Sequence, residues 1–307
     1  MALNSPFSGT GALSGAARQG TFDAHATSSR ARQGGGTVQE APTDDRAADE
    51  RVTALADALA QARTSRVGLE PLTSTHPDLD LPGAYAVQLE GVRRRVAAGE
   101  RVVGHKVGLS SRAMQRQLGV DSPDLGHLFA GEVLRSGATL QVGALLAPRV
   151  EPEIAFVLAR ALRGPDVSVE QVLAATDHVL PALEIIDSRI SDWRIGLVDT
   201  VADNASGAGA VLGDTPVPVN GLDLPGVAVQ LFLDDELVDS GTGAAVLEHP
   251  ARAVAWLAGT LSELDGGGLE AGHVVLSGSC TKAFPVHPGT RVRAELSGLG
   301  CVELTCT

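Results

Sequence analysis

VEPEIAFVL, residues 150–158, is the stretch that decides the fold. Side chains alternate between the two faces of a β-strand, so Glu151 and Glu153 share one face while Ile154 points to the other. Apolar residues occupy both faces of the second half of the stretch, which predicts a strand that is buried on both sides. The two glutamates then lie one strand repeat apart in apolar surroundings.

Two buried glutamates cannot both stay charged without compensation, because like charges repel and a carboxylate is costly to desolvate. Either one of the pair holds a proton, or a cation lies between them. A second apolar strand-like run, residues 180–187, adds a third carboxylate, Glu184. Three carboxylates on apolar strands favour a site for a hard cation, Mg²⁺ or Mn²⁺, with water and substrate in the open positions. The alternative is an edge strand with solvated glutamates.

Composition narrows the class of protein. The 307 residues are 44% hydrophobic, enough for a sizeable core, and the formal net charge of −13 argues against a nucleic-acid partner. No apolar run reaches the ~18 residues of a membrane span, and residues 1–10 lack the features of a secretory signal. Three cysteines without C-x-x-C spacing fit a reduced, cytoplasmic protein without a zinc site.

The domain organisation follows from where bulky apolar residues begin. Residues 1–46 are rich in small and polar residues, which predicts a disordered N-terminal extension. Residues 47–307 are expected to form a single domain, with a helical part in residues 47–100 and a core of strands in residues 101–307. The first helix is expected to begin near Asp44.

Most polar residues in the rest of the chain can be interpreted as parts of the local structure. Lys106 lies inside an apolar strand, where its ammonium group either reaches solvent or is held in a site. Asp124 on its own fits a turn. Ser168 begins a capped helix that is expected to continue to about His178. Residues 199–209 are small and polar and are expected to form a loop, and long loops often carry binding groups.

Several motifs, taken together, resemble one enzyme family. They are GHKVGLS at residues 104–110, PDLG at 123–126, EPE at 151–153, LEIIDSR at 183–189, DNAS at 203–206 and LEHP at 247–250. From about residue 50 to the C-terminus the chain resembles the 2-oxopent-4-enoate (2-hydroxypenta-2,4-dienoate) hydratases of the fumarylacetoacetate hydrolase superfamily. Leu125 departs from the family, which usually has Phe at this position, and the identity of the substrate's tail is therefore left undetermined.

The resemblance implies a fold and a metal site. The fold is α+β, a mixed and mainly antiparallel β-roll with peripheral helices, assembled into homo-oligomers. Residues 47–307 then form a single catalytic domain, whose core in residues 101–307 is the β-roll. The family's metal ligands map onto Glu151, Glu153 and Glu184, which agrees with the strand argument. The cofactor is then Mg²⁺ or Mn²⁺.

The resemblance also implies an activity. Lys106 and Asp124 match the family's catalytic residues on the substrate side. Ser206 and Ser279 match contacts with the substrate in the pocket. The reaction would add water to 2-hydroxypenta-2,4-dienoate or a close homologue, giving a 4-hydroxy-2-oxo acid in the meta-cleavage catabolism of aromatic or steroid rings. The implied partners are this small molecule and, in some members of the family, a sister enzyme of the same pathway.

Three alternatives accompany the hydratase hypothesis. A 4-oxalocrotonate (2-oxo-3-hexenedioate) decarboxylase shares the glutamates and the lysine but typically lacks the aspartate, so Asp124 favours the hydratase. An acylpyruvate-type C–C hydrolase needs a water-activating residue, usually a His–Glu pair, and no motif here supplies one. The presence of all three glutamates and of Lys106 argues against a non-catalytic partner subunit.

Overall fold

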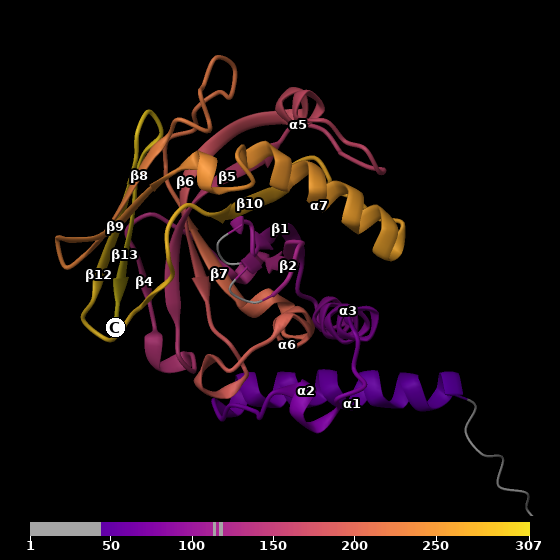
Figure 1. Ribbon diagram of the computed structural model, residues 1–307. Coiled ribbons are helices and arrows are strands. Elements are labelled where there is room, and N and C mark those ends of the chain that lie inside the picture. Colours follow the sequence, from indigo (N-terminus) through magenta and orange to yellow (C-terminus); the bar gives the residue numbers. More distant parts are fainter. Residues whose placement is uncertain (1–43, 113–114, 117–118) are drawn as a thin grey trace, which may run out of the picture. The chain divides into compact units, whose positions relative to one another are not determined.

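The computed structural model describes residues 44–112, 115–116 and 119–307, and Figure 1 shows how their helices and strands are arranged. Most of the expected N-terminal extension, residues 1–46, lies outside the described residues, which begin with helix α1 at Asp44. None of the described helices is long and apolar enough to cross a membrane.

Helices come first along the described chain: α1 (Asp44–Ser65), α2 (Leu72–Thr75) and α3 (Leu81–Ala97). Helix α1 buries Leu55 and Leu59, which are spaced one helical turn apart. Asp80 caps α3 by accepting a hydrogen bond from the Gly83 N–H at 2.9 Å. The later helices are α5 (Val169–Ala175), α6 (Leu197–Ala202) and α7 (Pro250–Asp265).

A curled sheet positions the candidate site. Within the described residues it has eight strands in the order β2-β1-β10-β5-β6-β7-β3, with β11 beside β5. Only β1–β10 and β3–β7 are parallel pairs among these described strands. The strands are β1 (Val102–Gly108), β2 (Asp124–Phe129), β3 (Val133–Arg135), β5 (Arg149–Leu158), β6 (Thr176–Ile186), β7 (Gly207–Leu212), β10 (Val274–Ser279) and β11 (Phe284–Pro285).

The two ends of this sheet meet and form a roll. A Cβ placed on Gly207 of β7 would lie 3.9 Å from Cε of Lys106 on β1, although three strands separate β7 from β1 in the sheet. Asn204 closes the seam: its side chain accepts a hydrogen bond from the His127 N–H at 2.8 Å and donates one to the His127 carbonyl at 3.0 Å. An amide side chain therefore pairs with β2 as a neighbouring strand would.

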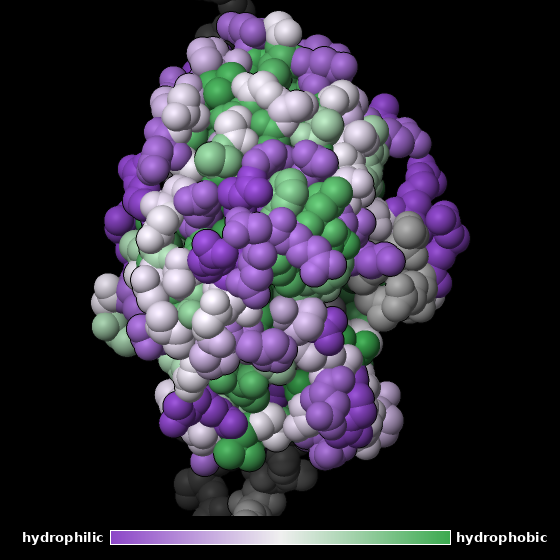
Figure 2. All heavy atoms as spheres, turned by 90° about the vertical axis from the view of Figure 1, so that its left-hand side faces the viewer, coloured by the Kyte–Doolittle hydropathy of each residue, from purple (hydrophilic) through white to green (hydrophobic). Residues whose placement is uncertain are grey.

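A second sheet packs on the outer face of the roll, in the order β4-β13-β12-β8-β9 among the described strands. Its strands are β4 (Ala138–Leu140), β8 (Ala228–Leu233), β9 (Glu236–Thr242), β12 (Arg291–Leu296) and β13 (Gly300–Cys306). Alternate residues such as Leu231, Val292 and Leu304 are buried against the roll. Hydrophilic side chains cover most of the opposite face, with small apolar patches between them (Figure 2). The expected α+β class with a mainly antiparallel roll is confirmed.

The structure corrects two local expectations. Helix α5 ends at Ala175 and β6 begins at Thr176, so His178 is a strand residue and not the end of a helix. The Thr176 hydroxyl donates to the Val172 carbonyl at 2.8 Å, which completes the last helical turn while the chain continues directly into the strand. Residues 199–209 are not a loop, because they contain the end of α6, a left-handed turn and the start of β7.

Candidate active site

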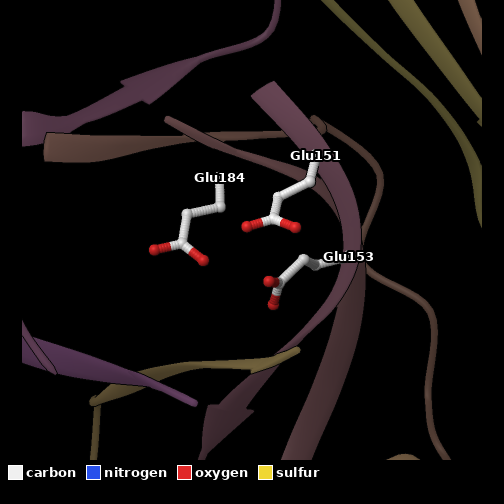
Figure 3. A group of neighbouring side chains, drawn as sticks. All are labelled: Glu151, Glu153 and Glu184. Atoms are coloured by element: carbon white, nitrogen blue, oxygen red, sulfur yellow. The ribbon is translucent and has the colours of Figure 1, made fainter. Parts of the chain in front are cut away.

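Three glutamates meet on the concave face of the roll. Glu151 and Glu153 come from β5, and Glu184 is the cross-strand neighbour of Glu151 on β6. Figure 3 shows the three carboxylates turned toward one another, and one oxygen from each lies within 4.8 Å of the others. Glu153 also accepts a hydrogen bond from the Gly278 N–H at 2.7 Å, which fixes the orientation of its carboxylate.

The surroundings of these carboxylates are apolar. An apolar floor continues the same face of the sheet beyond them, and it consists of Leu128, Ala155, Leu180, Ala182, Ala210, Leu212 and Leu276. Burial, reinforced by the charges of Glu184 and Glu151, raises the pKa of Glu153 well above its usual range. Burial also raises the pKa of Glu184 to about 7, against the lowering effect of Lys106.

This donor set fits a hard divalent cation. All three side chains offer oxygen atoms, which Mg²⁺ and Mn²⁺ prefer. Glu184 Oε1 is buried and accepts no hydrogen bond from the described residues, although it lies 3.3 Å from the Nζ of Lys106. Mutual repulsion and an unused buried oxygen are both relieved when a cation binds between the carboxylates.

Lys106 places a permanent positive charge beside this cluster. Its side chain points from β1 into the roll and is only 4% exposed. Burial alone would lower the pKa of Lys106, but nearby carboxylates, Glu184 foremost, raise it above its usual value. The ammonium group is therefore held in the site and does not reach solvent, which decides between the two sequence interpretations.

Asp124 is a strand residue and lies beside Lys106. It begins β2 and pairs across the strands with Gly108, so it faces the interior of the roll. A Cβ on Gly108 would lie 2.1 Å from Asp124 Oδ1 and 2.9 Å from Lys106 Nζ, so both side chains approach over bare glycine backbone. Asp124 is 2% exposed, and its Oδ1 accepts no hydrogen bond from the described residues. Burial raises the pKa of this carboxyl, while Lys106 lowers it.

A cavity of about 410 Å³ brings most of the predicted residues together. Its lining includes Lys106, Asp124, Glu151, Glu153, Ser206 and Ser279, whereas Glu184 is not part of the lining and contacts Lys106. The Ser206 hydroxyl lies 3.3 Å from that of Thr200, and the Ser279 hydroxyl donates to the Thr281 carbonyl at 2.9 Å. The size is within the range of about 300–1,000 Å³ that is usual for small-molecule sites.

A left-handed turn presents Ser206 to the cavity. The residues Asn204, Ala205 and Ser206 all have a positive φ, from 50° to 54°, which residues other than glycine rarely adopt. The buried Arg189 side chain forms an ion pair with Asp203 and donates to the carbonyls of Asp203 and Gly207, on either side of the turn. Strained turns of this kind persist only where surrounding contacts determine them, and they cluster at ligand sites.

Sequence reasoning missed several residues of the cavity wall. Arg149, Trp193, Thr200 and Lys282 line it, but they come from separate segments. Strand alternation was the available signal for Arg149, because it shares its face of β5 with Glu151. Nothing local in the sequence marks Trp193 or Lys282 as neighbours of the glutamates.

The class of protein follows from this fold and site. The family model described as fumarylacetoacetate (FAA) hydrolase C-terminal matches residues 103–307. The chain belongs to the fumarylacetoacetate hydrolase family, and the family expected from the sequence motifs is confirmed.

Relatives in this family narrow the class to hydro-lyases. A 2-keto-4-pentenoate hydratase of Paraburkholderia xenovorans is 46% identical over 248 residues, which cover 81% of this chain and 92% of that protein. A 2-oxo-hept-4-ene-1,7-dioate hydratase of Escherichia coli is 37% identical over 257 residues, covering 82% and 96%. Among solved structures, the 4-oxalocrotonate decarboxylase of Pseudomonas putida G7, complexed with magnesium and adipate, has a TM-score of 0.82 and 35% identity, covering 84% of this chain and 98% of that one.

Proposed function

We propose that this protein is a divalent-metal-dependent hydratase that adds water to 2-hydroxypenta-2,4-dienoate or a close homologue and releases a 4-hydroxy-2-oxo acid. One observation carries the proposal: a half-buried and two buried glutamate carboxylates, a buried ammonium group and a buried aspartate converge at one cavity. The identity to named hydratases, 46% over most of the chain, supports the reaction class.

In this proposal Glu151, Glu153 and Glu184 hold the cation. Mg²⁺ and Mn²⁺ both suit three carboxylates, and the magnesium complex of the decarboxylase relative supports a divalent ion. When bound, the ion supplies Lewis-acid stabilisation of negative charge on the 2-oxygen of the substrate. Gly278 contributes by fixing Glu153 through its N–H.

Lys106 and Asp124 have separate tasks in the proposed reaction. Lys106 stays protonated and adds positive charge where the substrate becomes anionic. The dienol first ketonises: its 2-hydroxyl gives up a proton and C5 gains one, which forms a 2-oxo-3-enoate. Asp124 then orients the attacking water and takes its proton as oxygen bonds to C4, and the same carboxyl returns a proton at C3. Burial favours this exchange, because it raises the pKa of Asp124 toward the range of an effective acid and base. Ser206 and Ser279 are the proposed hydroxyl contacts of the substrate.

A second candidate reaction is decarboxylation of 2-oxo-3-hexenedioate. The structural likeness to the 4-oxalocrotonate decarboxylase favours it. Decarboxylation needs no water at C4, so it gives Asp124 no role in activating water. The buried Asp124 next to Lys106 therefore supports hydration.

The location and assembly are proposals of the same kind. The three cysteines form no disulfide, which supports a reducing compartment such as the cytoplasm. We expect a homo-oligomer, on the ground of family membership, and sedimentation velocity measures its size. A complex with a sister enzyme of the pathway would appear as a heavier species when the two are mixed.

The test is a turnover assay of the Mg²⁺-loaded protein with each candidate substrate in turn. We expect 2-hydroxypenta-2,4-dienoate to be converted to 4-hydroxy-2-oxopentanoate, without release of carbon dioxide. Carbon dioxide released from 2-oxo-3-hexenedioate, with no hydration of the dienoate, would establish the decarboxylase instead. Turnover of neither substrate by a folded, metal-binding protein would favour a non-catalytic subunit.

A further inference from the structure

Two cationic side chains line the cavity without a salt bridge to a carboxylate, although Arg149 acts on Glu151: burial raises the pKa of that carboxyl, and the charge of Arg149 lowers it against this effect. Arg149 and Lys282 form no salt bridge with any residue in the described part of the chain. Lys282 is exposed and Arg149 is half-buried. The other buried or half-buried lysine and arginine residues of the described chain are paired, as Lys106 is with Glu184 and Arg189 is with Asp203. An unpaired guanidinium group in a cavity wall is available to bind an anion.

The register of β5 relates Arg149 to the metal cluster. Arg149, Glu151 and Glu153 occupy alternate positions of one strand, so they share a face and follow one another along it. Arg149 therefore lies one strand repeat, about 6.7 Å, beyond Glu151. A substrate whose 2-oxo acid end is held at the glutamates can reach Arg149 with its far end.

Trp193 fixes the guanidinium group of Arg149. The guanidinium carbon lies 4.4 Å from the centre of the indole ring, which also lines the cavity. The indole N–H donates to the Ala147 carbonyl at 3.0 Å, so the ring is held in place. Trp193 itself has a φ of 54°, a strained value that its surroundings must enforce. Arg149 is thus a positioned group and not a freely moving surface side chain.

We infer that Arg149, assisted by Lys282, binds a second carboxylate at the far end of the substrate, and that the preferred substrate is a 2-hydroxy-2,4-dienedioate. This inference rests on the proposed function, because the metal end defines which part of the substrate is distal. The relatives leave the question open, since one is named for a mono acid and another for a 1,7-dioate. A guanidinium group binds a carboxylate through two parallel hydrogen bonds, which a neutral tail cannot form.

The test measures binding, so that it does not depend on turnover. Saturated 2-oxoheptanedioate and 2-oxoheptanoate have the same carbon chain, cannot be hydrated at a double bond and differ only in the terminal carboxylate. Titration calorimetry on the Mg²⁺-loaded protein compares their Kd values. We expect the diacid to bind about 10-fold to 150-fold more tightly, which corresponds to a hydrogen-bonded interaction with a charged group.

Variants of Arg149 identify the group responsible. Arg149→Gln is expected to remove most of the preference for the diacid, and Arg149→Lys to restore only part of it, because lysine keeps the charge and loses the planar fork. Arg293→Gln is the matched control: Arg293 also stacks on an aromatic ring, Phe232 at 4.1 Å, but lies in the second sheet away from the cavity. The control is expected to bind both acids as the wild type does.

Two results would overturn the inference. One is equal affinity of the wild type for the two acids. The other is an equal loss of affinity for both acids in Arg149→Gln, because Arg149 would then act by positioning Glu151 and not by binding the distal end of the substrate. Hydration of 2-hydroxypenta-2,4-dienoate, assayed separately, tests the proposed function. A protein that binds the diacid selectively but hydrates no dienoate would support the site for the distal carboxylate and contradict the proposed function.

Discussion

Replacement of Gly108 by alanine tests whether Asp124 and Lys106 must approach each other over bare backbone. The added Cβ would lie 2.1 Å from Asp124 Oδ1, whereas real contacts of a Cβ essentially never fall below 3.0 Å. Asp124 and Lys106 are both buried, so neither can move into solvent. Gly108 does not have a left-handed φ, so alanine adds no backbone strain of its own. The carboxylate must therefore retreat by about 1 Å.

A displacement of about 1 Å in a catalytic group costs roughly 100-fold in rate, or about 2.7 kcal/mol of activation free energy. We expect kcat/KM for 2-hydroxypenta-2,4-dienoate to fall by that factor, while overpacking lowers the free energy of unfolding by about 1–3 kcal/mol. Steady-state kinetics, Mg²⁺ titration and thermal unfolding are measured on the same preparation. Gly131→Ala is the control, because nothing lies within 4 Å of its Cβ. A folded, metal-binding Gly108→Ala protein with the kcat/KM of the control would refute the reasoning.

Four further predictions concern the metal and three side chains. Removal of divalent ions should abolish activity. Glu153→Gln should weaken Mg²⁺ binding in calorimetry, yet it should raise the melting temperature of the metal-free protein because one buried repulsion between carboxylates is lost. A lowered melting temperature of this variant would contradict the reasoning. Asp124→Asn should reduce kcat by roughly 100-fold or more with unchanged Mg²⁺ affinity, and a wild-type rate would exclude it as the proton-transfer group. Burial lowers the pKa of His127 from 6.5 to about 4, so the unfolded chain binds the proton first. Stability is then complete above pH 6.5 and declines by about 3 kcal/mol as the pH falls to 4; urea unfolding of His127→Gln should show a weaker decline, and an identical pH profile would count against it.

The proposed metal-binding glutamates were predictable from the sequence because strand alternation is a strictly local rule. A two-residue repeat puts Glu151 and Glu153 on one face regardless of what packs around them, and the apolar neighbours of Glu184 mark its strand as buried. The motifs likewise predicted the α+β roll, through the family that they resemble. Each of these signals lies within a short segment of the chain and can be interpreted without knowledge of the tertiary structure.

What could not be predicted depends on contacts between distant segments. The left-handed turn at residues 204–206 exists because Arg189 binds the backbone on both sides of it, and no local propensity favours three such residues in a row. Helix α6 begins where the Asp199 side chain accepts hydrogen bonds from the N–H groups of Gly196 and Thr73, and Thr73 is 126 residues away. Trp193 reaches the cavity only through the same long-range packing.

Closure of the roll by the side chain of Asn204 has a consequence for self-association. An open strand edge offers a row of unpaired N–H and C=O groups to any other extended chain, and such edges initiate aggregation. At the seam of this roll the amide of Asn204 occupies the backbone groups of His127, and β2 is buried along its whole length. A buried edge of this kind is inaccessible to a foreign strand. Replacement of Asn204 by a residue without an amide would therefore endanger solubility as well as the geometry of the turn that carries Ser206.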